Sequence, residues 1–457
     1  MVIRRNVPLA LVLVVLVVTL CLLFYGHITT RIVSQGATDS CQVQTDIVAS
    51  HTAKKPWESS NVVVGPRKQR YEDNLRNDTY YVTAWVDSGF SNQFIGSVNM
   101  IYLGTVSDRV PIISPFTPGY HVSRSAGPLP FGDVFNMSEF RRTLRTPILE
   151  WSEIKALAPR LSTQRPAVVE QLGCWSTRSR NQQNPTRPEN LMNHLGLDVS
   201  YTRVPHWTRY NQGDLSDPHV ALLPLAELIF PVDPNDKPGS DPIMAASPLG
   251  AKLGPDTRMA CLDNLYFATV GTKSFEWEKP WSPVWRKIGR HLQFSDRVLR
   301  LTKGYLRRAF SVSSTDQLPP FISVHVRRGD FAKTCPDVTF GCLPPLAAYA
   351  RHVKEVQKAI FFKHNIKVSE VLVASDELDP AFWNQVKAEG WKYIDHGAEQ
   401  TFDEYGEWHG PIVDIVAQSF GIGFVGTKRS TVSLLSARRV QDWNQGVARM
   451  VDWNERG

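Results

Sequence analysis

The chain has 457 residues, of which 42% are hydrophobic and 21% are charged. This composition is ordinary for water-soluble globular proteins and argues against disordered, collagen-like and polytopic membrane chains. The length predicts two or three domains. The net charge of +7 is spread along the chain without a basic block, so we expect no nucleic-acid partner.

The first readable feature is an apolar run at residues 7–25, which carries no charge and is mostly Leu and Val. About 20 apolar residues match the thickness of the bilayer core, whereas the apolar part of a cleaved signal peptide is shorter and precedes small residues. Arg4 and Arg5 come before the run, so the positive-inside rule predicts a type II single-pass anchor with the rest of the chain outside the cytosol. The alternative is an apolar N-terminus buried in the fold.

Residues 26–76 are polar and lack sustained periodicity, and we expect them to form a stem. Glycosylation acceptor triplets begin at Asn77 and Asn136, which agrees with a luminal glycoprotein.

Cysteines outside the anchor also suit an oxidising compartment. Cys335 and Cys342 enclose a short loop and are the first expected disulfide, with Cys174–Cys261 next. Cys41, in the stem, either links two chains into a dimer or is a free thiol.

The first domain opens with a β-prone segment at residues 80–86, a tight loop at 87–93 and an apolar stretch of helical length at 94–103. We expect a surface insertion at 233–242 and a long helix at 282–310. The chain then divides into a cytosolic tail (1–6), an anchor (7–25), a stem (26–76), an N-terminal domain (77–290) and a C-terminal domain (291–457).

The last 140 residues alternate between strand and helix patterns. This alternation predicts an α/β fold with a parallel, doubly wound sheet, whose ligands bind beyond the carboxyl ends of the strands. The predicted strands are 320–326, 370–374, 391–394 and 421–425, and the predicted helices are 345–362, 380–389, 411–419 and 430–440.

The segment 325–331, His-Val-Arg-Arg-Gly-Asp-Phe, directly follows a predicted strand. A fixed guanidinium there, from Arg327 or Arg328, could hold two oxygens of a departing diphosphate while staying charged at any physiological pH. The alternatives are an ordinary surface Arg pair and, for Arg328-Gly329-Asp330, an adhesion tripeptide.

A second candidate is the segment 426–433, between a predicted strand and a helix. Its N–H groups and hydroxyls could hold phosphate, or Ser430 or Thr431 could be a simple N-cap. Asp376 and Asp414 could accept hydrogen bonds from a guanine edge, or each could be a helix cap or a solvated acid.

Several motifs are absent or misplaced. The GxGxxG match at residues 421–426 lies inside an apolar strand and is not a dinucleotide loop. The sequence contains no Asp-x-Asp, HExxH or GxSxG motif, which favours metal-free transfer chemistry over metal-dependent transfer or serine hydrolysis.

Three blocks of the sequence resemble the GDP-fucose fucosyltransferase superfamily, which includes protein O-fucosyltransferases and α1,6-fucosyltransferases. They are residues 89–93, 325–331, and Asp414 with 426–433, in the family order over about residues 79–440. The resemblance implies a GT-B fold, in which two Rossmann-like domains face one cleft and the C-terminal domain binds GDP.

The resemblance also implies roles for individual residues. Arg327 would contact the β-phosphate as a catalytic group. The substrate-binding residues would be Gly89, Phe90, Asn92, His325, Arg328, Asp376, Asp414, Ser430, Thr431 and Val432. Where relatives carry a Glu as general base, this chain has Cys335 or Ser88, so Asp87 and Asp330 are the substitutes.

We therefore expect an inverting fucosyltransferase in the Golgi or endoplasmic reticulum membrane. Its donor substrate would be GDP-fucose, its acceptor a glycan or protein hydroxyl, and it would use no metal and no other cofactor. The alternatives are a related transferase with another donor such as UDP-rhamnose, and a non-catalytic membrane-anchored glycan-binding protein.

Overall fold

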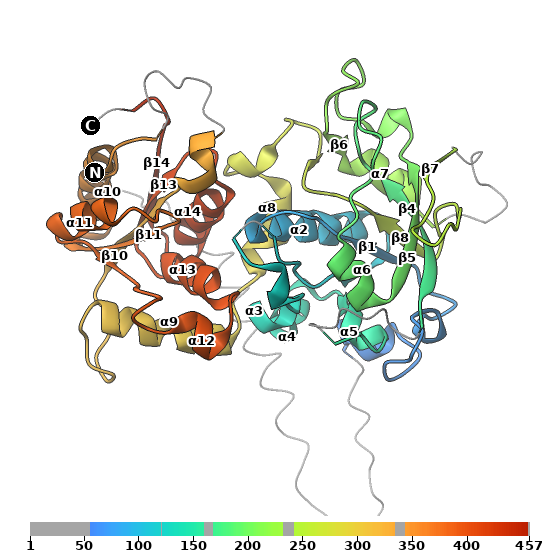
Figure 1. Ribbon diagram of the computed structural model, residues 1–457, viewed down its shortest axis with the longest axis horizontal. Coiled ribbons are helices and arrows are strands. Elements are labelled where there is room, and N and C mark those ends of the chain that lie inside the picture. Colours follow the sequence, from blue (N-terminus) through green and yellow to red (C-terminus); the bar gives the residue numbers. More distant parts are fainter. Residues whose placement is uncertain (1–54, 120, 160–167, 232–241, 334–342, 456–457) are drawn as a thin grey trace, which may run out of the picture. The chain divides into compact units, whose positions relative to one another are not determined.

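The computed structural model describes residues 55–119, 121–159, 168–231, 242–333 and 343–455 (Figure 1). It contains sheets of seven, five and two strands with helices packed on them, which confirms the predicted α/β class. The predicted anchor lies outside the described residues. Among those residues, no helix is long and apolar enough to span a bilayer.

The seven-stranded sheet is built within residues 77–290. Its strands are parallel, except that β7 runs antiparallel to β5. The order is β3 (Leu149–Glu150), β2 (Val110–Ile113), β1 (Tyr81–Ala84), β8 (Met259–Leu262), β4 (Glu170–Ser176), β5 (Leu197–Arg203) and β7 (Ile243–Ala245). A separate parallel pair joins β6 (Val220–Ala221) to β9 (Ala268–Thr269).

Helices cover both faces of this sheet, because successive strand residues point to opposite sides. In β1, Val82 and Ala84 pack in the cluster that contains α2, whereas Tyr81 packs in the cluster that contains α5 and α6. The helices are α2 (Phe90–Val106), α3 (Phe131–Val134), α4 (Met137–Leu144), α5 (Trp151–Ile154), α6 (Glu189–Leu195), α7 (Leu222–Ile229) and α8 (Pro283–Lys287).

The five-stranded sheet is built within residues 291–457 and is parallel throughout. Its order is β12 (Lys392–Tyr393), β11 (Glu370–Ser375), β10 (Phe321–Val326), β13 (Gly423–Thr427) and β14 (Val447–Val451). Its helices are α9 (Asp296–Ala309), α10 (Leu346–His364), α11 (Pro380–Ala388), α12 (Thr401–Tyr405), α13 (His409–Ser419) and α14 (Thr431–Trp443).

This second sheet is doubly wound, as the alternating sequence pattern predicted. Ile322, Val324 and Val326 of β10 pack with α10 and α11, whereas Phe321 packs with α9 and α13 on the opposite face. Figure 1 shows these helices around the sheet. Strand β14 was not predicted, because its segment has little apolar alternation.

The long helix predicted at residues 282–310 is wrong. The segment forms α8, a 3₁₀ turn η7 (Gly289–His291), and then α9 with Ser295 as its N-cap. The Ser295 hydroxyl accepts the Val298 N–H at 3.5 Å, which starts a new helix. Gly289 packs so closely on Trp285 that a Cβ would lie 2.7 Å from the indole ring. Capping and close packing therefore override the helical periodicity.

The stem predicted over residues 26–76 is too long at its C-terminal end. Tyr71 and Leu75 are 2% and 4% exposed and belong to the core of the seven-stranded sheet. The Tyr71 N–H donates to the buried carboxylate of Glu170 at 2.9 Å. The sequence did not predict this packing, because its apolar residues have no regular spacing. The described part of the segment, residues 55–76, forms short 3₁₀ turns (η1, Ser59–Asn61; η2, Glu72–Asn74) and no regular helix.

One predicted disulfide is present: Cys174 of β4 is bonded to Cys261 of β8. Both residues are fully buried. The pair ranked first from the sequence, Cys335–Cys342, lies outside the described residues, as do Cys41 and residues 233–241 of the insertion predicted at 233–242.

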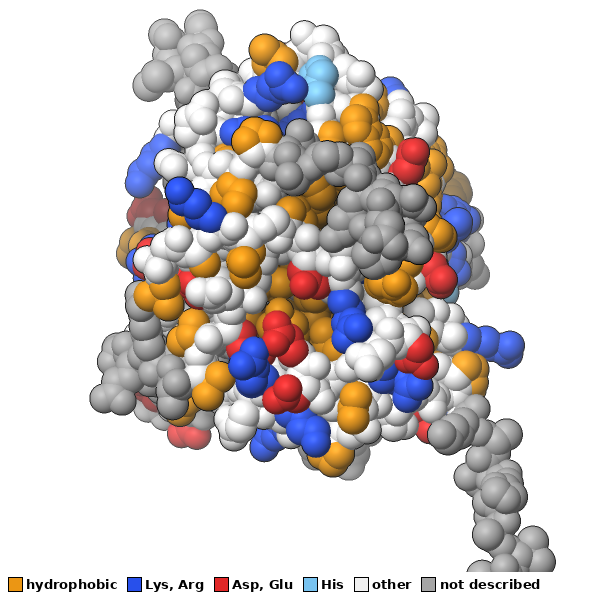
Figure 2. All heavy atoms as spheres, turned by 90° about the vertical axis from the view of Figure 1, so that its right-hand side faces the viewer, with side chains coloured by type: hydrophobic (Ala, Val, Ile, Leu, Met, Phe, Trp, Pro, Cys, Tyr) orange, Lys and Arg blue, Asp and Glu red, His pale blue; other side chains and the backbone are white. Residues whose placement is uncertain are grey.

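The surface carries charges of both signs. On the face drawn in Figure 2, Lys and Arg side chains lie among Asp and Glu side chains, with apolar side chains between them. This mixture agrees with a net charge that is spread along the sequence.

Candidate functional site

The candidate site lies at the carboxyl ends of β10, β11 and β13, which are neighbours in the five-stranded sheet. β10 is a run of six buried residues, three of them β-branched, and ends at Val326, where the chain becomes polar. The Arg327 N–H donates to the Thr427 hydroxyl, and the Arg328 N–H donates to Asp376, both at 2.8 Å. These two bonds fix the loop after β10 to the ends of both neighbouring strands.

The Arg327 guanidinium is held by two carboxylates. Its Nη2 lies 2.6 Å from Asp330 Oδ1 and its Nη1 lies 3.0 Å from Asp376 Oδ2. The side chain is 13% exposed, and the guanidinium lies 5.5 Å from the centre of the Phe331 ring. Gly329 permits this approach, because a Cβ there would lie 2.4 Å from Asp376 Oδ2. The site thus holds a planar fork of donors in one orientation, which suits phosphate oxygens.

Arg328 has different partners. Its Nε lies 2.5 Å from Glu377 Oε2, and its guanidinium lies over the Phe382 ring at 5.4 Å. Hydrogen bonds from the Asp379 N–H and from Arg328 lower the pKa of Glu377, so this acid is ionised and pairs with Arg328 at neutral pH. The two arginines therefore form ion pairs with different carboxylates, Arg327 with Asp330 and Asp376 and Arg328 with Glu377.

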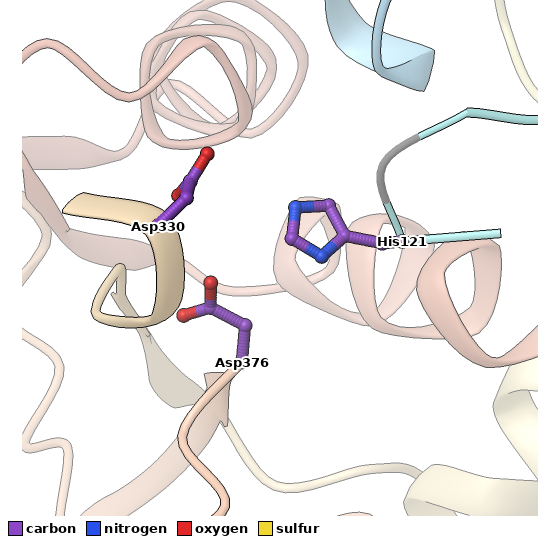
Figure 3. A group of neighbouring side chains, drawn as sticks. All are labelled: His121, Asp330 and Asp376. Atoms are coloured by element: carbon purple, nitrogen blue, oxygen red, sulfur yellow. The ribbon is translucent and has the colours of Figure 1, made fainter. Parts of the chain in front are cut away.

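His121 joins the Arg327 group from the N-terminal half of the chain. Figure 3 shows its imidazole directed toward the carboxyl groups of Asp330 and Asp376. A ring nitrogen of His121 and one carboxylate oxygen of each Asp lie within 4.8 Å of one another. Burial and the charge of Arg327 lower the pKa of His121, while Asp376 and Asp330 oppose that shift. The imidazole is thus mainly neutral near pH 7.

These three side chains also offer the atoms that a divalent cation could bind. Both carboxylates are already the ion-pair partners of Arg327, whose positive charge lies where the cation would have to be. A cation would have to displace the guanidinium, so we assign no metal to this group.

His325 lies behind Arg327 in a buried hydrogen-bond network. Its Nδ1 lies 2.7 Å from the Ser433 hydroxyl, and the Thr427 hydroxyl donates to the His325 carbonyl at 3.1 Å. Tyr349 reaches the same Thr427 hydroxyl at 2.7 Å. Burial, with the charge of Arg327, lowers the pKa of His325 to about 3. His325 therefore stays neutral and braces the ends of β10 and β13.

The N-termini of α14 and α2 meet beside this network. Ser430 is the N-cap of α14 and accepts the Ser433 N–H at 3.4 Å. The next residue, Thr431, donates its hydroxyl to Asn92 Oδ1 at 2.7 Å, and Asn92 donates to Ser88 at 2.8 Å. Two of the three sequence blocks are thus hydrogen-bonded to each other across the two sheets.

Other predicted residues lie at or near these helix starts. Gly89 is the N-cap of α2, and Phe90, its first residue, stacks on Phe116 with ring centres 4.5 Å apart. Val432 is half-buried in the first turn of α14. Asp87 is exposed in the loop after β1.

Asp414 lies in a different polar group. On α13, its Oδ1 is 3.2 Å from His396 Nε2, and His396 Nδ1 is 3.0 Å from the buried Thr401 hydroxyl, which also meets Tyr305 at 2.9 Å. Burial lowers the pKa of His396, but the hydrogen bond and charge of Asp414 raise it more, so the net shift is upward. In the described part of the chain, the hydrogen bond of Asp414 goes to His396.

Sequence reasoning missed His121, Tyr349 and Glu377. His121 has no motif around it and reaches the site only through the fold. Tyr349 lies in α10, and its position gives a signal only if the register of the helix on the sheet is known. Glu377 directly follows a predicted strand and Asp376, so its position was the one available signal.

No protein-family model matches the chain, and no curated protein matches it. The crystal structure of POFUT1 in complex with GDP-fucose is similar, at 16% sequence identity, with 82% of this chain and 98% of that chain covered and a TM-score of 0.45. The fucosyltransferase NodZ from Bradyrhizobium is similar at 11% identity, with 79% and 93% covered and a TM-score of 0.39. Fucosyltransferase structures, the class that the three sequence blocks resemble, are thus among those similar to this chain.

Proposed function

We propose that this chain is an inverting, metal-independent glycosyltransferase of GT-B architecture that transfers fucose from GDP-fucose to a hydroxyl group of a glycan or protein. The single observation that carries the proposal is the oriented guanidinium of Arg327 at the carboxyl end of β10, beside the N-terminus of α14. Two sheets of mainly parallel strands, each with helices on both faces, support the architecture.

The chemistry follows from charge. When the bond between the sugar and the β-phosphate breaks, the departing diphosphate gains negative charge, and the guanidinium can bind two of its oxygens. The N-terminus of α14 adds the partial positive charge of a helix start. Both groups are fixed before the substrate binds, so little reorganisation accompanies the reaction.

The experiment uses the full chain in detergent. GDP-fucose should bind and protect the protein in thermal-shift measurements, and fucose should be transferred to a member of a glycan and protein acceptor library in the presence of EDTA. UDP-rhamnose and other nucleotide sugars serve as competitors. A requirement for divalent cations, or preference for another donor, would contradict the proposal, and binding without turnover would favour the glycan-binding alternative.

The apolar run at residues 7–25 supports a type II orientation in the Golgi or endoplasmic reticulum membrane. Protease protection of residues 55–455 in microsomes, and a loss of mass after glycosidase treatment that is smaller in an Asn77→Gln variant than in wild type, would test this placement. Asn77 is exposed and suits the second measurement.

A further inference from the structure

One step of the proposed reaction, the removal of the acceptor proton, has no well-placed base among the residues that the sequence predicted. As the acceptor hydroxyl attacks the sugar, its proton must leave. Of the two candidate bases, Asp330 is ion-paired with Arg327 at 2.6 Å, and Asp87, in the loop after β1, is not among the described residues that cluster with Asp330 and Asp376. Asp330 already neutralises the charge of Arg327, which binds the departing diphosphate, so it is poorly placed to accept a proton as well.

We propose that His121 is the general base that accepts the proton of the acceptor hydroxyl. This inference rests on the proposed function, since it concerns the same transfer. His121 comes from the opposite half of the chain to Arg327 and is exposed, yet its ring is directed toward Asp330 and Asp376 (Figure 3). An acceptor can therefore reach the imidazole from solvent while the donor diphosphate is bound at Arg327.

The loop that carries His121 is anchored on both sides. Before it, Phe116 exchanges two backbone hydrogen bonds of 2.8 Å with Leu129, which closes the base of the loop. After it, the Ser123 N–H donates to Glu407 at 2.8 Å, and Trp408 donates to the Gly127 carbonyl at 2.9 Å. These bonds tie the loop to the segment before α13 and position its backbone before substrate binds, as base catalysis requires.

The charges around the ring suit proton uptake. Arg327, Asp330 and Asp376 are the charged groups that act on it, and the neighbouring His325 is neutral. With a pKa below its usual value, the ring is mainly unprotonated near neutral pH, so it is ready to accept. Once it is protonated, the carboxylate of Asp376 stabilises the imidazolium.

The step is balanced as follows. The acceptor oxygen forms a bond to the anomeric carbon, the bond from that carbon to the β-phosphate oxygen breaks, and its electron pair leaves with GDP beside Arg327. The proton of the hydroxyl moves to the unprotonated ring nitrogen of His121. Because the residue is exposed, that proton then passes to water.

The test compares His121→Ala with wild type in the full chain. Removal of a general base lowers the rate of transfer about 10²–10⁴-fold, whereas affinity for GDP-fucose should be unchanged. Added imidazole should restore part of the lost rate in His121→Ala. His364→Ala is the matched control: His364 is a half-buried histidine at the end of α10 whose Nε2 lies 3.0 Å from the Gln445 carbonyl, and this variant should transfer fucose at the wild-type rate with or without imidazole.

The pH profile separates a base from a structural residue. In wild type, kcat/KM should rise with pH through a pKa below 6.5, and this limb should disappear in His121→Ala. His121→Gln, which fills the space, should be as slow as His121→Ala but without rescue, and it serves if the Ala variant fails to fold.

Near-normal transfer in either variant overturns the assignment, as does an unchanged acidic limb. A loss of GDP-fucose binding in His121→Gln would instead make His121 a donor ligand and also overturns it. If the wild-type protein neither binds GDP-fucose nor transfers fucose, the proposed function is wrong. If the wild-type protein and the His121 variant are both active, only the role of His121 is wrong.

Discussion

Replacement of Arg327 tests the reaction chemistry most directly. If the guanidinium stabilises charge as the glycosidic bond breaks, Arg327→Ala should lower kcat much more than it weakens GDP binding. Loss of one such contact costs about 2.7–4 kcal/mol, or on the order of 10²–10³ in rate. Arg327→Lys should recover only part of this loss, because an ammonium group cannot hold Asp376 and two phosphate oxygens in one plane as a guanidinium can.

The structure adds a second effect that the experiment must separate. Asp330 and Asp376 lie 2.6 and 3.0 Å from the guanidinium, so its removal leaves two carboxylates without their cation. Each would repel a bound diphosphate by about 1 kcal/mol if fully solvated and by about 4 kcal/mol near a protein surface. Because Asp330 is 42% exposed, its share lies toward the lower figure.

The double variant Arg327→Ala/Asp330→Asn resolves the two effects. It removes one of the uncompensated carboxylates, so GDP binding by calorimetry should improve over the single variant while kcat for fucose transfer stays low. Arg328→Ala should show a smaller rate loss, because its guanidinium is paired with Glu377 at 2.5 Å. Arg308→Ala is the neutral control, since this exposed residue pairs with Glu399 instead. Near-normal turnover in Arg327→Ala together with an inactive Arg328→Ala would refute the assignment.

Three further predictions concern stability. Arg439→Met should raise the free energy of unfolding by about 1–4 kcal/mol in denaturant titrations, because the fully buried guanidinium of Arg439 has aromatic rings at 4.9–5.7 Å but no hydrogen-bond acceptor among the described residues. Replacing both Cys174 and Cys261 by Ala should lower the unfolding free energy by about 4–5 kcal/mol, since the disulfide closes a loop with a sequence separation of 87; an unchanged denaturation midpoint would contradict this. The pKa of about 3 for His325 lies below its unfolded value, so the unfolded state binds one more proton between about pH 6.5 and 3, and stability decreases by about 1.4 kcal/mol for each unit by which the pH is lowered in that range. Titrations at pH 6.5, 5.5 and 4.5 should show a slope smaller by that amount in His325→Gln.

Local patterns predicted most of the five-stranded sheet because its elements carry their own signals. β10 is rich in apolar residues, and α10, α11 and α14 each begin beside a Pro or Ser that favours a helix start. The errors came where tertiary packing decides the structure. Tyr71 and Leu75 look like part of a polar stem until the sheet provides a surface to bury them, and Ser295 looks like a helix interior until its hydroxyl caps α9.

The candidate site divides in the same way. Arg327, Ser430 and Thr431 could be proposed from sequence, because a parallel sheet puts the residues after its strands at one edge. His121 could not, since it carries no motif and meets Asp330 only because the loop after β2 is tied to Glu407 and the segment before α13. Pairings between distant parts of the chain depend on loop geometry, which no periodicity encodes.

The charge balance at Arg327 links the donor site to the proposed base. Without substrate, one guanidinium faces two carboxylates, so a diphosphate can bind only if one of the carboxylates gives way. Asp376 is 17% exposed and also accepts the Arg328 N–H, whereas Asp330 is 42% exposed and has Arg327 as its ion-pair partner. Asp330 is therefore the group that should yield, and the variant that carries Asp330→Asn reports on that exchange. A carboxylate displaced toward solvent by the donor cannot also be held against the acceptor hydroxyl, whereas His121 lies on a loop with its own anchoring hydrogen bonds and is not an ion-pair partner of Arg327 that the donor replaces.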